Sequence, residues 1–145
     1  MIVRNITDTK SLRQIITVKP TDPVRAATET LAKHRIGAVI VSSDGAIVDG
    51  ILSERDIVRA LGTKGPAILD LLAQDLMTAT VVSCHPDDTA LSVLERMTDG
   101  RFRHMPVIED NRMVGVISIG DVVKARLAEI QTENAALTDM IANSW

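Results

Sequence analysis

The sequence predicts a mixed α/β (α+β) protein made of two copies of one β-α-β-β-α unit, followed by a long C-terminal helix. The first observation is a repeat: the ten residues that begin at Gly50 return 65 positions later, beginning at Gly115. The second is a matching order upstream, where Pro20 and Pro86 stand 66 positions apart. A unit this small cannot bury its own apolar face, so we expect the two copies to pack their sheets together as one module.

Composition narrows the functional classes. The chain has 145 residues, 46% hydrophobic and 24% charged, which suits one compact domain. Its net charge of −3 provides no broad basic surface for nucleic acid, and its two aromatic residues, Phe102 and Trp145, cannot form a base-stacking platform. The single cysteine, Cys84, excludes an internal disulfide, and residues 1–10 lack the apolar run of a signal or membrane segment. We therefore expect a cytoplasmic protein with no nucleic-acid or membrane partner.

The first copy has recognisable starts and stops. A β-prone run at 14–18 precedes Pro20, and the helix after it has Thr21 or Asp22 as its expected cap. An apolar strand at 38–41 follows, then a turn and a second strand that ends at Leu52.

The second copy repeats this order, with a β-prone run at 81–84, a helix, a strand at 105–108 and a strand that ends at Ile117. Between the copies, the leucines of residues 67–77 predict a linker helix. The predicted boundaries are an N-terminal segment with unit 1 over 1–64, the linker over 65–77, unit 2 over 78–127 and a helical extension over 128–145.

The last helix carries a heptad seam with one polar member. Its residues are Val123, Leu127, Ile130, Asn134, Leu137 and Ile141. This spacing predicts a coiled coil and hence a homodimer, in which a buried asparagine would fix the register. Because the seam is shorter than three heptads, it also fits a final helix folded back on the module, and this alternative stays open.

A hydroxyl and a carboxylate recur at one spacing, in Ser53-x-x-Asp56 and Ser118-x-x-Asp121. Each pattern fits a capping box, in which serine caps a helix and the acid reaches back to the serine N–H. Aspartate is shorter than the usual glutamate or glutamine, so we expect both carboxylates to face outward. An outward carboxylate at a helix N-terminus can accept hydrogen bonds from the two vicinal hydroxyls of a ribose.

These motifs, with the Pro-x-x-x-apolar helix before them, closely resemble a cystathionine-β-synthase (CBS) domain pair of the stand-alone type, over roughly residues 14–127. The resemblance implies a regulatory module with two clefts related by a pseudo-two-fold axis. It implies AMP, ADP, ATP or S-adenosylmethionine as ligand, and NAD also fits a wide cleft. It assigns Ser53 and Asp56 to one cleft, and Ser118 and Asp121 to the other.

The resemblance also implies that the first short strand and the start of the central strand line each cleft. The nucleotide-binding residues predicted in this way, besides the two serines and two aspartates, are Thr17, Lys19, Gly37, Ala38, Ser83, His85, Arg101, Arg103, His104, Met105 and Pro106. Lys19 would then meet a phosphate, and the clefts would differ, with Arg103 and His104 favouring the more charged group. A solvated basic loop is the alternative for the arginines.

The sequence does not favour catalysis. The candidates for a nucleophile, base or metal ligand are Cys84, His34, His85 and His104, which have no ligand spacing, and no glycine-rich phosphate loop is present. The predicted function is a non-enzymatic adenine-nucleotide sensor that requires no cofactor and acts through an unknown effector protein. The alternative is a ligand-independent scaffold that forms homo-oligomers.

Overall fold

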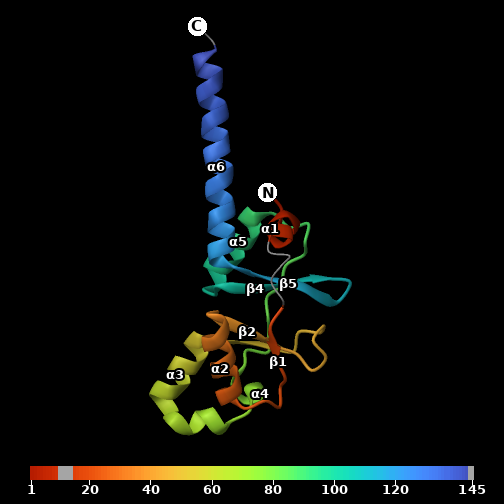
Figure 1. Cartoon of the computed structure of the whole chain (residues 1–145), viewed down its shortest axis with the longest axis vertical. Coiled ribbons are helices and arrows are strands. Elements are labelled where there is room, and N and C mark those ends of the chain that lie inside the picture. Colours follow the sequence, from red (N-terminus) through yellow and green to blue (C-terminus); the bar gives the residue numbers. More distant parts are fainter. Residues whose placement is uncertain (10–14, 144–145) are drawn as a thin grey trace.

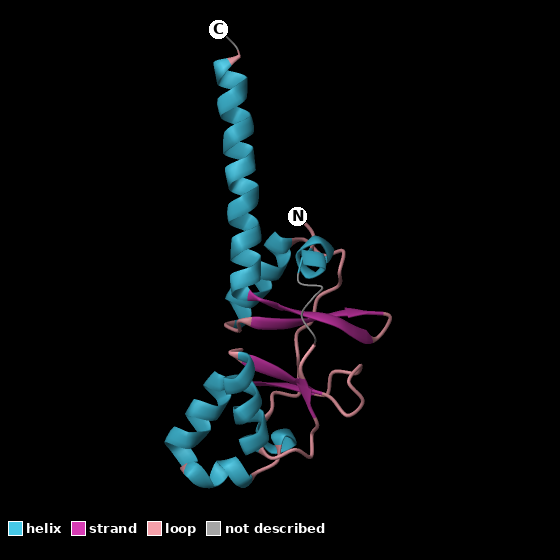
Figure 2. Ribbon diagram, in the orientation of Figure 1, coloured by secondary structure: helices cyan, strands magenta, loops and turns pink. Residues whose placement is uncertain are grey.

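The two predicted units form two stacked layers in a computed structural model that describes residues 1–9 and 15–143 (Figure 1). The sheets of the two units lie at the centre, and helices cover their outer sides (Figure 2). A backbone hydrogen bond of 2.8 Å joins the layers directly, from Met113 N in unit 2 to Ala46 O in unit 1. The predicted fold class is confirmed.

Unit 1 places its central strand between two neighbours. Its elements are β1 (Thr17–Val18), α2 (Val24–His34), β2 (Ala38–Val41), β3 (Gly50–Ser53) and α3 (Glu54–Lys64). The strand β2 runs parallel to β1 and antiparallel to β3, and all four of its residues are buried. The predicted β-prone run begins at residue 14, which lies outside the described residues.

Unit 2 repeats the order, and its sheet has two strands among the described residues where that of unit 1 has three. Its elements are α5 (Ala90–Gly100), β4 (His104–Glu109), β5 (Arg112–Ser118) and α6 (Ile119–Ala142). The run at 81–84, predicted as a strand, forms a single parallel bridge between Cys84 and Val107. This bridge corresponds to the pair Val18 and Val41 of unit 1. The segment before α5 therefore pairs in the same parallel direction as β1, although it forms only one bridge.

Each unit is completed by a short helix from outside it, either α1 (Val3–Thr9) or α4 (Ala73–Leu76). In unit 1, Ala73 N donates to Asp22 O at 2.7 Å; in unit 2, Val3 N donates to Asp88 O at 2.8 Å. Asp22 and Asp88 are equivalent positions, so α1 does for unit 2 what α4 does for unit 1. The N-terminal segment, which the sequence grouped with unit 1, thus packs into the core of unit 2, where Val3 is fully buried.

The linker differs from the single helix expected at 67–77. The structure has a 3-10 helix, η1 (Pro66–Asp70), then extended backbone at Leu71 and Leu72, and then α4. The extended backbone lets Leu72 form a β-bridge with Pro23, which fastens the linker to the start of α2. A continuous helix would have no backbone groups available for this contact.

The start of α2 also corrects a prediction. Its N-cap position is Pro23, and neither Thr21 nor Asp22 caps it through a side chain. Asp22 Oδ2 instead accepts the N–H of Lys19 at 2.9 Å, and this hydrogen bond tightens the turn that precedes the helix.

The C-terminal helix α6 projects away from both layers (Figure 1). Residues 131–143 are all exposed, and the seam residues Leu137 and Ile141 are each 57% exposed. The alternative that this helix folds back on the module is therefore wrong.

Candidate functional site

Both Ser-x-x-Asp motifs lie where the last strand of their unit ends and the first long strand begins, and we call this end of each sheet the Ser-x-x-Asp edge. Ser53 ends β3 opposite Ala38, the first residue of β2, and Ser118 ends β5 opposite His104, the first residue of β4. In each unit the following helix begins at this edge. The repeated hydroxyl and carboxylate are thus held where a strand end meets a helix start.

The two motifs form capping boxes. Asp56 Oδ2 accepts the N–H of Ser53 at 3.0 Å, and Ser53 Oγ accepts the N–H of Asp56 at 3.1 Å. The corresponding distances for Ser118 and Asp121 are 2.9 and 3.1 Å. The expectation that aspartate would be too short to reach back is wrong, because the extended backbone at each serine turns its N–H toward the carboxylate.

Capping leaves part of the Asp56 carboxylate available. The hydrogen bonds of Asp56 with Ser53 use Oδ2, and within residues 1–9 and 15–143 Oδ1 accepts none. Asp56 and Asp121 are both half-buried. A hollow of about 570 Å³ lies on the exposed face of α3, where it is lined by Glu54, Arg55, Val58 and Arg59, and Asp56 is not among its lining residues. The first motif thus keeps a half-buried carboxylate with one oxygen outside its capping bonds.

The two units meet at this edge. A Cβ built on Gly37 would lie 3.0 Å from His104 Cε1 and 3.3 Å from Glu54 Oε1. Gly37 thus leaves room for a side chain of unit 2, and His104 lies beside the Ser-x-x-Asp edge of the opposite unit. Backbone contacts repeat here as well: Glu54 N donates to Gly37 O at 2.9 Å, and Ile119 N donates to Arg103 O at 2.8 Å.

Two predicted residues lie at the other end of the sheet. Lys19 follows Val18, which pairs with Val41, whereas Ser53 pairs with Ala38 at the opposite end of β2. Four residues of strand separate the two levels, or about 13 Å. Lys19 lines a different hollow of about 430 Å³, and its equivalent His85 is exposed. The structure therefore does not bring the side chains of Lys19 and His85 to the Ser-x-x-Asp edge.

The parallel direction of β1 places two apolar residues near the Ser-x-x-Asp edge that the sequence analysis did not name. The chain enters β1 on the Ser53 side, so the half-buried Ile16, one residue before Thr17, lies nearer that edge than Lys19 does. In unit 2 the equivalent is Val82, which precedes Ser83 and is 43% exposed. In the sequence both residues are apolar and lie outside the predicted helices, but the strand direction was needed to place them at this edge.

The remaining predicted residues have clear structural roles. Arg101 is exposed and ends α5 in the left-handed conformation at φ 57°, as Arg35 ends α2 at φ 53°. The repeated arginine thus marks a helix C-cap. Met105 is buried in the core of unit 2, whereas its strand neighbour Pro106 is buried on the opposite face of β4, and Arg103 is exposed.

The cysteine and histidines form no reactive cluster among the described residues. Burial raises the pKa of the Cys84 thiol to about 12, which keeps it protonated near neutral pH.

No group of three His, Cys, Asp or Glu side chains within residues 1–9 and 15–143 is placed to hold a metal ion. No helix in those ranges is long and apolar enough to cross a membrane.

Comparison with known families identifies the repeated unit. The model of the CBS domain matches residues 3–63 and 73–128, which is most of the chain. The chain belongs to the CBS-domain family. The matched segments include α1 with unit 1 and α4 with unit 2, so in this CBS pair each unit contributes its leading helix to the other.

Relatives with CBS domains cover most of the chain. The mitochondrial CBS-domain protein CBSX3 of Arabidopsis thaliana is 34% identical over 128 residues, 86% of this chain and 62% of the relative. This chain thus spans about three fifths of that relative's length. The crystal structure of a CBS-domain protein from Agrobacterium tumefaciens shares 46% identity at a TM-score of 0.82, covering 87% of this chain and 99% of that one. A CBS pair solved with 5′-methylthioadenosine and S-adenosyl-L-methionine has a TM-score of 0.75 and 24% identity, covering 89% and 98%, and this likeness shows the fold.

Proposed function

We propose that this CBS pair is a non-enzymatic regulatory sensor that binds an adenine nucleotide, AMP, ADP, ATP or NAD, at the Ser-x-x-Asp edge of each unit. The main support is that an aspartate carboxylate which caps a helix occurs at the same strand-to-helix junction in both units. In unit 1 this carboxylate keeps Oδ1 outside its capping bonds, so it can accept from ribose hydroxyls without giving up those bonds.

The surrounding side chains suit an adenosine. Ile16 and Val82 offer aliphatic surface for a ring in a chain with almost no aromatic residues, and Arg55 and Arg59 provide cations beside the first motif for phosphate groups. The CBS pair solved with 5′-methylthioadenosine and S-adenosyl-L-methionine supports the same class, since both molecules contain adenosine. We assign no nucleotide role to the side chains of Lys19, His85, Met105 and Pro106.

The proposed sensor acts through other protein chains. We propose that the nucleotide signal passes to an effector protein in the cytoplasm. We propose that the protein is a homodimer joined through α6, whose apolar seam is exposed on the single chain.

The exposed seam also favours a second candidate, a ligand-independent scaffold. In that case α6 oligomerises the protein and the clefts have no regulated occupant.

Isothermal titration calorimetry separates the two functions. We expect saturable heat with at least one of AMP, ADP, ATP, NAD and S-adenosylmethionine, and none with GTP as the control. The double variant Asp56→Asn/Asp121→Asn should lose most of this heat while remaining folded by circular dichroism. Absence of saturable heat for every adenine compound would overturn the sensor and leave the scaffold.

A further inference from the structure

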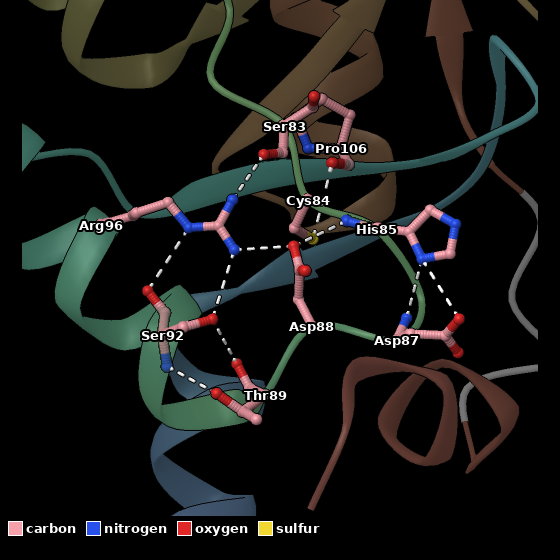
Figure 3. Close-up of polar contacts among 9 residues, drawn as sticks. All are labelled: Ser83, Cys84, His85, Asp87, Asp88, Thr89, Ser92, Arg96 and Pro106. Atoms are coloured by element: carbon pink, nitrogen blue, oxygen red, sulfur yellow. Dashed lines mark hydrogen bonds and ion pairs between the residues drawn. The ribbon is translucent and has the colours of Figure 1, made fainter.

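Arg96 of α5 forms a clamp on the segment that leads into unit 2 (Figure 3). Its Nη1 donates to Ser83 O at 2.8 Å, and its Nη2 donates to Asp88 Oδ2 at 2.7 Å. The same carboxylate oxygen accepts the N–H of His85 at 2.9 Å. One guanidinium thus joins the two ends of residues 83–88 to each other and to the helix behind them, through charge-assisted bonds.

Within residues 1–9 and 15–143, unit 1 has no equivalent of this clamp. The residue in the place of Arg96 is Thr30, whose hydroxyl donates to Ala26 O of its own helix at 2.9 Å. Asp22, the equivalent of Asp88, accepts the N–H of Lys19, and no guanidinium in the part of the chain that the structure describes contacts its carboxylate. The turn is therefore common to both units, whereas the link from the turn to the helix belongs to unit 2.

Arg96 binds a segment that forms few backbone hydrogen bonds with the sheet. In unit 1 the entering segment forms the strand β1, whereas in unit 2 it forms one bridge at Cys84. Around this bridge, Cys84 N donates to Pro106 O at 3.0 Å and Ile108 N donates to Cys84 O at 2.8 Å. Arg96 binds the next carbonyl upstream, that of Ser83, and so supplies an anchor that the sheet does not.

The anchored segment leads to the second candidate cleft. Extending the parallel register of Cys84 and Val107 upstream brings Val82 level with Met105 and Val81 level with His104, which pairs with Ser118. Fixing the Ser83 carbonyl therefore fixes the two valines within about 7 Å of strand from the anchor.

We propose that Arg96 is a positioning residue for the nucleotide cleft of unit 2, which it organises in advance by holding the 81–84 segment against α5. This inference rests on the proposed function, and it makes the two clefts unequal: in unit 2 the Arg96 side chain adds to the backbone bonds of the wall, whereas among the described residues of unit 1 strand pairing holds it. A cleft organised in advance loses less conformational entropy on binding.

The test measures each cleft separately. Arg96→Ala is combined with Asp56→Asn, which leaves the unit 2 cleft, and in parallel with Asp121→Asn, which leaves the unit 1 cleft. We expect AMP affinity by calorimetry to fall about 10-fold at the unit 2 cleft and less than about 2-fold at the unit 1 cleft. Arg96→Lys should recover most of the loss, because an ammonium can still bond Ser83 O or Asp88. Arg25→Ala, which removes an exposed arginine from α2, is the matched control.

Amide hydrogen exchange gives a readout that needs no ligand. Arg96→Ala should speed exchange at Cys84 and Ile108 about 10-fold more than at the amides of β2. A fall in thermal stability without a selective loss of AMP affinity at unit 2 would overturn the proposal, and so would equal losses at both clefts. If the unmodified protein binds no adenine compound, the proposed function fails, and exchange alone decides: selective acceleration supports the clamp, and uniform exchange refutes it.

Discussion

The imidazole of His104 lies over Gly37, in the space that a side chain at residue 37 would occupy. The contact joins the first strand of one sheet to the residue before the central strand of the other, at the edge where both Ser-x-x-Asp motifs lie. Because each residue comes from a different unit, this contact reports directly on how the two layers are held together.

Gly37→Ala should lower the free energy of unfolding by about 1 kcal/mol, because the added methyl group overpacks the contact with His104. Urea unfolding measures this change. In a His104→Ala background the same substitution should cost almost nothing, since the obstructing ring is gone. The control is Gly62→Ala, in open space on α3, which should be neutral or stabilising. An equal cost in both backgrounds would contradict the contact.

The capping boxes predict that the two roles of Asp121, its negative charge and its capping hydrogen bond, can be separated by substitution. Asp121→Asn retains an acceptor for the Ser118 N–H but loses the charge, so stability should change little while AMP affinity falls about 10-fold. Asp121→Ala should lose both, with about 1 kcal/mol of stability. Calorimetry and urea unfolding on the same samples measure the two effects. Wild-type affinity in Asp121→Asn would remove the carboxylate charge from the binding site.

Local spacing was sufficient to predict the repeated features. The equivalence of Asp56 and Asp121 follows from a shift along the chain, and the capping partner lies three residues away, so no knowledge of the rest of the fold was needed. The heptad positions of α6 were found in the same way. Where the prediction was wrong, at the reach of aspartate, the error lay in the backbone angle of one residue, Ser53 or Ser118.

Features that depend on distant pairing were not predictable. The position of Lys19 at the end of the sheet away from Ser53 could not be predicted, because it depends on the direction of β1 relative to β2, which composition and period do not contain. The packing of Val3 on unit 2 joins residues more than 80 positions apart, and sequence order alone favoured the nearer unit. Arg96 looks like an ordinary solvated residue of an amphipathic helix until Ser83 and Asp88 are placed beside it.

Acid should loosen the Asp88 turn. The N–H of His85, and after it Arg96, lower the pKa of Asp88 below its ordinary value. A carboxylate with a lowered pKa contributes stability that is fully present above the unfolded-state pKa of about 3.9 and is lost as the pH falls through the folded-state pKa. Unfolding measured from pH 7 to pH 2 should therefore show a shallower acid limb in Asp88→Asn than in the unmodified protein. Asp99→Asn, at an exposed site on α5, is the control; identical acid limbs for Asp88→Asn and the unmodified protein would contradict this role.

The exposed seam of α6 predicts a dimer that one charge can separate. Leu137 occupies a seam position and is 57% exposed on the single chain, whereas the neighbouring Ala136 lies off the seam. In a two-stranded coiled coil, Leu137→Asp would bury two like charges against each other, while Ala136→Asp would leave its charge in water. Sedimentation velocity should therefore give a dimer for the unmodified protein and for Ala136→Asp, and a monomer for Leu137→Asp. A chain that ends at Leu127 should also be monomeric, because it retains the two CBS units without most of the seam. If that shortened chain still sediments as a dimer, the faces of the CBS units and not α6 hold the two copies together.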